Sequence, residues 1–543
     1  MDRLIKTCLR TVICLLILLN PCIANATNSD DGDTHHLPLI VINTHGQAIP
    51  DDPKIAVFMG IIDNGPNKTN RPTDPFNDYN GLIGIELRGS SSQQFPKKSF
   101  GFETWDHAGN DSSVSLLGFP SETDWVLYAP YSDKSLLRNS LAYYMFGRFG
   151  HYSPRTKFVE LYLNGQYRGI YVLVEKIKGG PSRVDIDNLT AADIRDLELT
   201  GGYILKLDKS TGDENNEGFY SRNAPIIINR PHFFIFDDPD GDEIQPAQRN
   251  YIRNKVNDFE ASLRSTYYKD PEAGYRSYLD VQSFVDFFII NEISRNIDGL
   301  RLSSYLYKDR DDRDPRFHAG PAWDYDIAFG NCYYGGADLS TGWQYLYEED
   351  DHPIPFWWER LMTDNYFTGN LRCRWNQLRE GVLHTDSLND YIDGLVELIG
   401  DAATRNFASF PILGSYVWPN PYIGNTYQEE VIYLKNWISQ RASWLDGNMP
   451  GTCAVTGGPE HKKHGFQAFL YPNPANDQIN LEILNPEKKK LQLSLYHVTG
   501  HLVYSESLEE AAQITRNIKL PSGIYQVILR DHLEHITLKA IVN

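Results

Sequence analysis

The sequence predicts an α+β protein with two lobes, followed by a small all-β sandwich. Strand patterns dominate residues 37–178, and helical patterns dominate residues 179–450. Residues 451–465 contain glycine, proline and charge with little to pack, which is typical of a linker. Short alternating strands return over residues 466–543, as in an independent β-sandwich. We therefore expect a strand-rich lobe and a helix-rich lobe with a cleft between them.

The strand-rich lobe is predicted from short alternating segments. They cover residues 37–43, 54–62, 84–88, 98–103, 125–129, 157–164 and 167–176. Asn164-Gly165 between the last two predicts a tight hairpin, because both residue types tolerate positive φ. One helix over residues 134–148, capped by Ser132 or Asp133, interrupts these strands.

Apolar residues at helical spacing define the second lobe. They predict helices over residues 246–263, 280–294, 356–363, 366–380, 385–405 and 427–446. A strand pair is expected at residues 303–308 and 318–323, joined by an acidic turn.

The first 26 residues are typical of a secretory signal peptide. Three basic residues precede a short apolar run over residues 12–19, and Ala24-Asn25-Ala26 then provides small residues at a cleavage site. A lipoprotein anchored through Cys22 is the weaker alternative, because Asn20 and Pro21 precede it where small residues are expected. Residues 27–36 are polar, so we expect disorder there. No later stretch is long and apolar enough to cross a bilayer, so we expect no transmembrane segment in the mature chain.

The charge and the cysteines exclude several functions. The formal charge of −20 becomes more negative without the basic leader, so the chain should repel nucleic acid and anionic membranes. Three of the six cysteines lie in the leader. Cys332, Cys373 and Cys453 remain, which is neither a disulfide framework nor a zinc signature, although one bridge among them is possible.

Two segments of the first lobe could contact a nucleotide. Arg88, Gly89 and Ser90 leave backbone N–H groups open to an anion, and Lys97 and Lys98 could neutralise phosphate charge. A polar turn before a lysine-bearing strand is the simpler interpretation of that pattern alone. Residues 171–176, which include Glu175, could form an interlobe strand that pairs with a base edge. The pattern alone favours a buried strand that reaches the surface.

Aspartates follow apolar elements in the second lobe. Asp298 follows a helix, and Asp324 and Asp326 follow a strand. Phosphoryl transfer needs such a set, with one carboxylate to accept a hydroxyl proton and others to hold Mg²⁺ on the phosphates. Each aspartate taken alone is more often a helix cap or a turn residue.

Six motifs occur in order and together resemble the spore-coat protein H (CotH) kinase-like family over about residues 37–450. They are ELRGSSSQQFPKKSFGFET, LLGFPSETDWVLYAPYSDKSLLRNSLAYYMFGRFG, ELYLNGQYRGIYVLVEKIK, GGYILKLDK, NIDGLRLSSYLYKD and PAWDYDIAFGN. The resemblance implies a two-lobed atypical protein-kinase-like fold that uses ATP and Mg²⁺.

The same resemblance implies residue roles. Asp298 would be the catalytic base, and Asp324 would bind the metal with Asp326 close enough to assist. Lys97 or Lys98 would contact the phosphates, and Glu175 would mark the hinge.

Two positions depart from the family pattern. Ser303 stands where many relatives have an asparagine that binds a second metal, and a hydroxyl is a poorer Mg²⁺ ligand than an amide oxygen. The helix over residues 134–148 lacks the acid that pairs with the lysine in ordinary kinases. Both departures bear on turnover.

The tail has a separate resemblance, to the C-terminal sorting domain of the bacterial type IX secretion system. It rests on Leu470-Tyr471-Pro472-Asn473-Pro474-Ala475, on Leu495-Tyr496 with Gly500, and on Leu520-Pro521-Ser522-Gly523-Ile524-Tyr525. The resemblance implies type IX machinery as a partner, a Bacteroidetes-type envelope, and a protein that is secreted or held at the outer surface.

Together these features favour an exported ATP- and Mg²⁺-dependent kinase that acts on serine or threonine of a protein, or on another hydroxyl. The alternative is a non-catalytic surface protein that binds or adheres; a carbohydrate-active protein is favoured only by the many Trp and Tyr residues. Acidic loops at residues 237–243 and 309–314 could bind Ca²⁺, but solvated turns explain them better.

Overall fold

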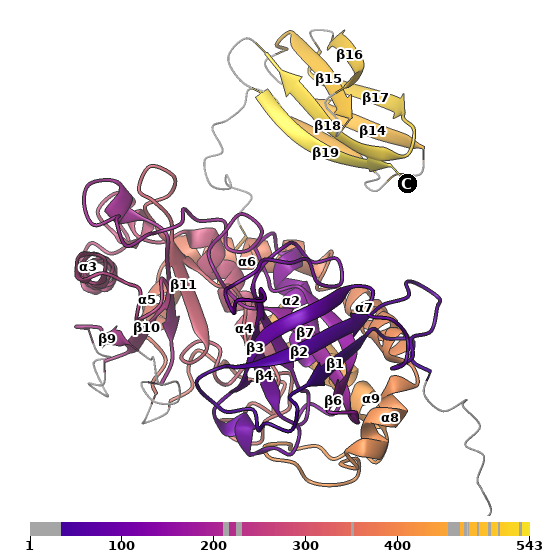
Figure 1. Cartoon of the computed structure of the whole chain (residues 1–543). Coiled ribbons are helices and arrows are strands. Elements are labelled where there is room, and N and C mark those ends of the chain that lie inside the picture. Colours follow the sequence, from indigo (N-terminus) through magenta and orange to yellow (C-terminus); the bar gives the residue numbers. More distant parts are fainter. Residues whose placement is uncertain are drawn as a thin grey trace, which may run out of the picture. The chain divides into compact units, whose positions relative to one another are not determined.

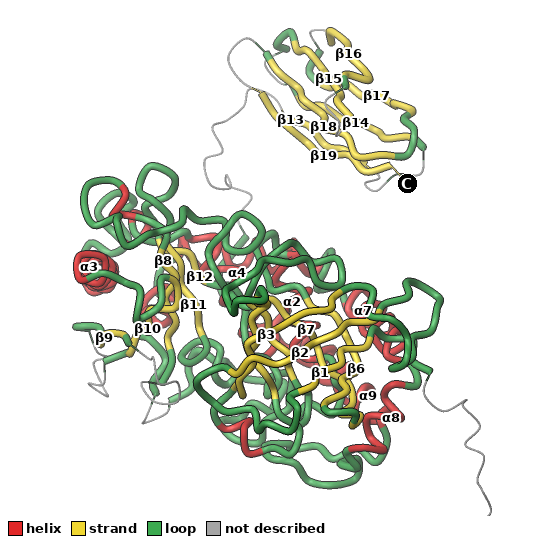
Figure 2. Tube along the Cα trace, in the orientation of Figure 1, coloured by secondary structure: helices red, strands yellow, loops and turns green. Residues whose placement is uncertain are grey.

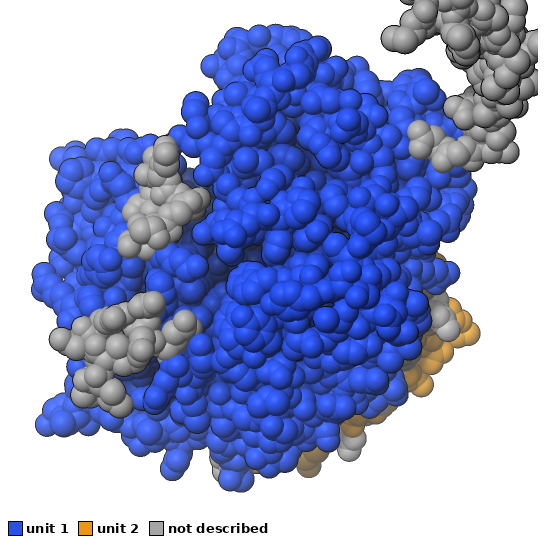
Figure 3. All heavy atoms as spheres, turned by 90° about the horizontal axis from the view of Figure 1, so that it is seen from below, with its two compact units in different colours: residues 1–452 blue, residues 453–543 orange. Residues whose placement is uncertain are grey.

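The computed structural model describes residues 34–209, 217–223, 231–348 and 352–453, and most of residues 467–542. The predicted signal peptide, residues 27–33 and most of the predicted linker lie outside this part. The chain divides into two compact units, residues 1–452 and 453–543, which are coloured separately in Figure 3. The first unit contains both strands and helices, and the described part of the second contains strands, as predicted.

Seven strands of the first unit close into a barrel, in the order β1-β2-β3-β4-β5-β7-β6 (Figure 1). The strands are β1 (Leu39–Asn43), β2 (Ile55–Ile62), β3 (Tyr79–Arg88), β4 (Ser99–Trp105), β5 (Asp124–Tyr128), β6 (Thr156–Leu163) and β7 (Gln166–Glu175). All seven predicted strands are therefore present. The β6–β7 hairpin has φ of 52° at Asn164 and 74° at Gly165, which explains why these residue types occupy the turn.

The helix that interrupts the barrel strands is shorter than predicted. Helix α2 (Arg138–Arg148) begins four residues later than expected. The Asp133 carboxylate accepts hydrogen bonds from the backbone N–H groups of Ser135 and Arg138, and it also binds the Arg138 guanidinium. Asp133 therefore orders a turn ahead of the helix, so that the helix itself starts at Arg138.

The segment before the barrel differs from the predicted disorder. His35 is buried, and its Nδ1 lies 2.7 Å from Oε2 of Glu160 on β6. Its Nε2 lies 3.0 Å from the Tyr162 hydroxyl, and its backbone exchanges hydrogen bonds with Asn70. A histidine that satisfies a buried carboxylate cannot be recognised from a polar sequence alone, so the ordered domain starts earlier than expected.

The second part of this unit contains a five-stranded sheet, in the order β12-β11-β8-β10-β9. Its strands are β8 (Tyr203–Leu207), β9 (Gly218–Tyr220), β10 (Phe233–Asp238), β11 (Ser304–Lys308) and β12 (Phe317–Ala319). Only β11 and β12 were predicted as strands, and β12 is shorter than expected. The sheet is visible beside the barrel in Figures 1 and 2.

Helices pack on one face of this sheet and also against the barrel. They are α3 (Pro246–Arg264), α4 (Val281–Ser294), α5 (Trp357–Met362), α6 (Asn365–Arg379), α7 (Thr385–Ile399), α8 (Ala402–Ser409) and α9 (Tyr427–Asn448). The single helix predicted over residues 385–405 is two helices, because Gly400 takes a φ of 49° and ends α7.

The two faces of β8 have different neighbours. Leu205 and Leu207 belong to the large core that includes α3, α4 and α5. Ile204 instead packs with Tyr305 and Val184 in a smaller cluster on the opposite face. Since side chains alternate along a strand, Lys206 lies on the face opposite the helical core.

The C-terminal unit consists of two small sheets, in the orders β13-β14-β17 and β16-β15-β18-β19. The strands are β13 (Gln467–Tyr471), β14 (Gln478–Leu484), β15 (Leu491–His497), β16 (Leu502–Leu508), β17 (Gln513–Lys519), β18 (Gly523–Arg530) and β19 (His535–Val542). Residues from both sheets, such as Ile479 and Val527, share one apolar core. The prediction of an all-β domain is confirmed.

The cysteines of the described chain are in two states. Cys373 and Cys453 are each disulfide-bonded, and Cys332 is a buried free thiol. None of the described helices is both long and apolar enough to span a bilayer.

Candidate active site

Asp298 lies in a tight loop directly after α4. The helix ends at Ser294 because Arg295 adopts a left-handed conformation, with φ of 45°. The Asp298 carbonyl then accepts hydrogen bonds from the backbone N–H groups of Arg301 and Leu302, at 2.9 and 2.7 Å. This turn fixes the backbone from which the carboxylate projects.

Gly299 is required by close packing under this loop. A Cβ at that position would lie 1.9 Å from Oδ1 of Asn291 on α4. The same Asn291 oxygen accepts a hydrogen bond from the Tyr325 hydroxyl at 3.1 Å. Asn291 therefore connects the loop of Asp298 with the loop of Asp324, and only glycine leaves room for it.

Asp324 lies in the loop that follows β12, and this loop contacts the loop of Asp298. Its carbonyl accepts a hydrogen bond from Nδ2 of Asn296 at 2.9 Å, which joins the two loops a second time. The Ser303 hydroxyl lies 3.3 Å from Oδ2 of Asp324 and 3.4 Å from Oδ2 of Asp208. Asp324 and Ser303 both have positive φ, 64° and 46°, a strain of about 1–3 kcal/mol each that is typical of functional sites.

Lys206 and Asp208 also belong to this site, although their residue types and spacing led to no predicted role. Nζ of Lys206 lies 2.6 Å from Oδ2 of Asp208. Burial lowers the pKa of Lys206, but the charge and hydrogen bond of Asp208 together with the charge of Asp237 outweigh it, and the net pKa is raised. The segment GGYILKLDK could have indicated this pair. A lysine and an aspartate two residues apart on a strand project from the same face of it.

The aspartates repel one another in this crowded site. Burial raises the pKa of Asp298 to about 6, helped by the charge of Asp324 and opposed by Arg301, whose Nη2 is 2.9 Å away. Burial also raises the pKa of Asp324, although its side chain keeps contact with solvent. The pKa of Asp326 lies well above its ordinary value, through burial and then the charge of Asp324.

Arg88 is the barrel residue that reaches the aspartates. It ends β3, and its guanidinium lies 5.3 Å from the centre of the Trp323 ring. Its charge lowers the pKa of Asp324, the residue next to Trp323. Ser90, by contrast, is exposed at the start of a 3₁₀ turn (Ser91–Gln94) and makes no side-chain cap there.

The two lysines expected at the phosphates lie elsewhere. Lys97 is buried, with Nζ 2.5 Å from the carbonyl oxygen of Ile170 and 2.8 Å from Oδ1 of Asn406 on α8. Burial without a carboxylate partner lowers its pKa well below the ordinary value. Lys98 donates instead to the carbonyl of Gln93. The structure thus does not bring either lysine to the aspartates.

Glu175 is also placed differently from the expectation. Its carboxylate is fully buried and binds Nη1 of Arg155 at 2.6 Å and the Tyr152 hydroxyl at 3.2 Å. Nε of Arg183 lies 3.5 Å away on the same carboxylate. These contacts assign the side chain to a structural ion-pair cluster at the end of β7.

The carboxylates of the site provide two ligands for a small divalent cation, not a complete ligand set. The described residues form no cluster of three or more His, Cys, Asp or Glu side chains arranged for a metal. Mg²⁺, however, needs only one or two carboxylates with phosphate oxygens and water. Asp208 and Asp324, which share the Ser303 hydroxyl, satisfy that smaller requirement.

The acidic loop at residues 309–314 is neutralised by its own basic residues. Arg310 binds Asp312 at 2.8 Å, Arg313 binds Asp309 at 3.0 Å, and Lys308 binds Asp311 at 2.6 Å. The loop at residues 237–243 uses Asp238 to accept the backbone N–H of Gly179. These contacts pair three of the acidic residues of the loop at residues 309–314 with basic residues.

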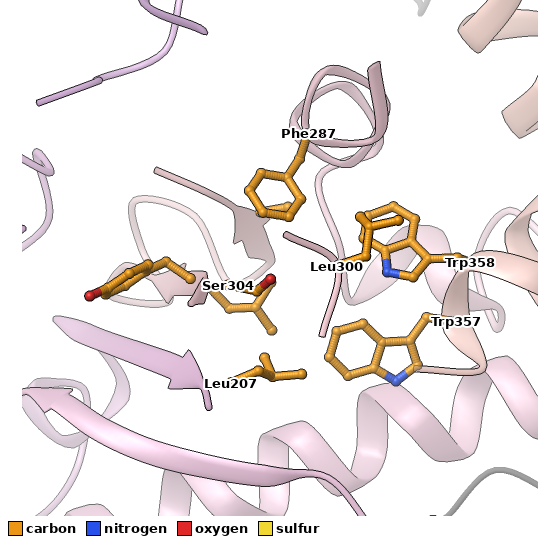
Figure 4. Close-up of a pocket in the computed structure, with 9 residues that line it drawn as sticks. Leu207, Phe287, Leu300, Ser304, Trp357 and Trp358 are labelled. Carbon is orange, nitrogen blue, oxygen red and sulfur yellow. The ribbon is translucent and has the colours of Figure 1, made fainter. Parts of the chain in front are cut away.

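A small void beneath the Asp298 loop is a packing feature. Figure 4 shows Phe287, Leu300, Trp357 and Trp358 around it, with Leu207 and Ser304 opposite. Its volume of about 10 Å³ is at the limit for one water molecule. It is therefore not a ligand pocket.

Known proteins resemble this chain over the range that contains these site residues. A family described as CotH kinase protein matches residues 85–445, which is more than half of the chain and includes every residue of the site above. The chain belongs to the CotH family.

A curated relative is the inner spore coat protein H of Bacillus subtilis (strain 168). It is 30% identical over 160 residues, which are 27% of this chain and 41% of the relative. The match thus spans less than half of that CotH protein's length.

The tail of this CotH-family chain matches a second family. Residues 469–543 match the secretion system C-terminal sorting domain. This domain indicates type IX sorting, with secretion and export to the cell surface.

Proposed function

We propose that this secreted CotH-family protein is a kinase that transfers the γ-phosphoryl group of ATP to a hydroxyl on a surface or extracellular molecule. The observation that carries the proposal is the convergence of Asp298, Asp324 and Lys206 on one site, from segments far apart in the sequence. Three such groups have the charges that phosphoryl transfer requires.

Asp298 is the general base in this proposal. As the acceptor oxygen bonds to the γ-phosphorus and the bond to the β–γ bridging oxygen breaks, the hydroxyl proton passes to the Asp298 carboxylate. A pKa near 6 leaves that carboxylate ionised at neutral pH but basic enough to accept a proton. Arg301, 2.9 Å away, holds it in one orientation.

Lys206 and Arg88 would compensate the phosphate charge. Lys206 is held by Asp208, and Arg88 approaches Asp324 from the barrel. Two cations from different parts of the unit can neutralise phosphate oxygens on both sides. This assignment replaces the one expected for Lys97 and Lys98.

Asp324 and Asp208 are the residues that would hold Mg²⁺, with the Ser303 hydroxyl between them. Mg²⁺ bound there would neutralise charge on the ATP phosphates. Lys206 limits how much negative charge the two carboxylates present when no cation is bound.

Ser303 favours the alternative of a non-catalytic surface-binding protein. Its hydroxyl lies 3.3 Å from Asp324, where many relatives provide an amide oxygen. A weaker ligand would lower the affinity for the metal and with it the turnover.

The test is phosphoryl transfer from labelled ATP, to the protein itself and to extracellular protein from the same cells. The proposal expects transfer by the wild type and none by Asp298→Asn, with nucleotide affinity almost unchanged in the variant. Wild-type transfer that survives in Asp298→Asn would contradict the role of the base.

A further inference from the structure

Lys206 interacts with a second carboxylate, Asp237, to which the proposed function gives no role. Asp237 lies near the end of β10 and is half-buried. Burial lowers the pKa of Lys206, and the charges of Asp208 and then of Asp237 raise it. The lysine therefore has one acidic neighbour on its own strand and another on the adjacent strand.

Strand pairing places Asp237 on the same face of the sheet as Lys206. Ile235 and Lys206 are partners in the antiparallel ladder between β10 and β8. Side chains two residues apart on a strand share a face, so Asp237 projects from the face of Ile235 and Lys206, opposite the helical core. Residues in such diagonal positions are about 7–8 Å apart, which a long side chain can span. The next residue, Asp238, instead accepts the backbone N–H of Gly179.

Basic residues of the barrel also act on Asp237. Burial raises the pKa of Asp237 to about 6, so the carboxylate is mostly ionised at neutral pH. The charges of Lys206, then of Lys176 and Arg88, oppose this rise. Lys176 has a partner of its own, because its Nζ lies 3.6 Å from Oδ1 of Asp124. Among these three cations, Lys206 has the largest effect on Asp237.

Asp208 has two contacts that compete. Its Oδ2 lies 2.6 Å from Nζ of Lys206, and the proposed function uses the same carboxylate to hold Mg²⁺. A carboxylate that coordinates a dication presents less negative charge to a neighbouring ammonium group, and the cation itself repels that group. A second anion is therefore needed if Lys206 is to keep its charge and its place after the metal has bound.

We propose that Asp237 is a positioning residue that holds Lys206 against the ATP phosphates while Asp208 binds Mg²⁺; this inference rests on the proposed kinase function. Without the cation, Asp208 is sufficient to hold the lysine. With the cation, the charge of Asp237 offsets the repulsion between Mg²⁺ and Lys206. Asp237 also repels the phosphates, but that effect is present with and without Mg²⁺, so the two effects can be separated.

The test measures ATP affinity of the full chain by isothermal titration, with and without Mg²⁺. The variants are Asp237→Asn, Asp237→Glu and Lys206→Met, and the double variant of Lys206→Met with Asp237→Asn. Asp242→Asn is the control, because Asp242 is exposed in the turn that follows β10.

Asp237→Asn should weaken ATP binding by about fivefold or more with Mg²⁺, and should not weaken it without Mg²⁺. Asp237→Glu should retain most of the wild-type affinity, and Asp242→Asn all of it. In the Lys206→Met background, Asp237→Asn should cause no further loss. Unchanged or tighter ATP binding by Asp237→Asn under both conditions would overturn the proposal, because the carboxylate would then have no effect or only repel phosphate.

A second measurement needs no nucleotide. Urea unfolding of the parent chain, Asp237→Asn, Lys206→Met and their double variant gives the coupling between the two charges. This coupling should be larger when the whole set carries Asp208→Asn, which removes the competing carboxylate. Absence of coupling in that set would overturn the role of Asp237 and leave the kinase function intact. A wild type that binds no ATP under either condition would contradict the kinase function and the positioning role together.

Discussion

Nζ of Lys206 lies 2.6 Å from Oδ2 of Asp208, and this pair adjoins Asp324 on the sheet face opposite the helical core. The lysine is thus a cation of the site proposed for the ATP phosphates. Its partner keeps it charged although the surrounding protein would otherwise favour the neutral form.

Lys206→Met should weaken Mg²⁺-ATP binding by about tenfold or more, because the variant removes a charge-assisted contact to phosphate. Lys97→Met should leave nucleotide affinity unchanged, since Lys97 bonds only to the neutral oxygens of Ile170 and Asn406. Isothermal titration of both variants makes the comparison. A loss of affinity confined to Lys97→Met would restore the original assignment.

Asp298→Asn should stabilise the protein at neutral pH. The pKa of Asp298 is about 6 in the folded state, against an ordinary value of 3.8, so wild-type stability falls as pH rises from about 4 to about 6. The amide does not ionise and should be more stable by about 3 kcal/mol at pH 7.5, with almost no advantage near pH 4. Urea unfolding at both pH values measures this.

Asp242→Asn is the matched control for that experiment, because Asp242 is exposed. Its stability should follow the wild type at both pH values. Equal stability of Asp298→Asn and the wild type at pH 7.5 would show that the carboxylate is not strained by its surroundings.

Ser303→Asn should lower the Mg²⁺ concentration needed for half-maximal ATP binding. An amide oxygen is a better ligand than a hydroxyl, and asparagine tolerates the φ of 46° more readily than serine. Ser303→Ala, which removes the hydroxyl between Asp208 and Asp324, should raise that concentration. If neither variant changes it, Ser303 does not contact the metal.

His35→Ala should destabilise the first unit by about 1–3 kcal/mol, because a buried carboxylate loses one partner. Glu160 keeps Arg405 at 2.8 Å, which limits the effect. The adjacent His36→Ala is the control, since His36 is exposed. Equal thermal midpoints for the two variants would favour the disorder expected from the sequence.

Local pattern was enough to predict the barrel strands and most helices, but it missed β8, β9 and β10. Apolar and polar residues alternate clearly along a strand where one of its faces is exposed to solvent. The strand β8 is central, and four of its five residues are buried, so its sequence YILKL shows no clean period. The same central position hid Lys206 as a functional residue.

The placement of Lys97 and Glu175 away from the aspartates depends on contacts that the local sequence does not show. Lys97 and Lys98 are adjacent, and no local rule decides which of them is covered by α8, more than 300 residues further along the chain. Glu175 is likewise satisfied by Arg183 and Arg155 rather than by a ligand. Asp298 and Asp324 were found through the family motifs, because each carboxylate alone is indistinguishable from a turn residue.

The most direct test of the proposed function is Mg²⁺-dependent ATP binding by the wild type and by Asp324→Asn. The amide replaces the anionic oxygen that the cation prefers, so the affinity of the variant should fall by about tenfold or more with Mg²⁺ and change little without it. Isothermal titration at neutral pH provides both values. Wild-type protein that binds ATP equally well with and without Mg²⁺, or not at all, would contradict the kinase function and leave surface binding as the better account.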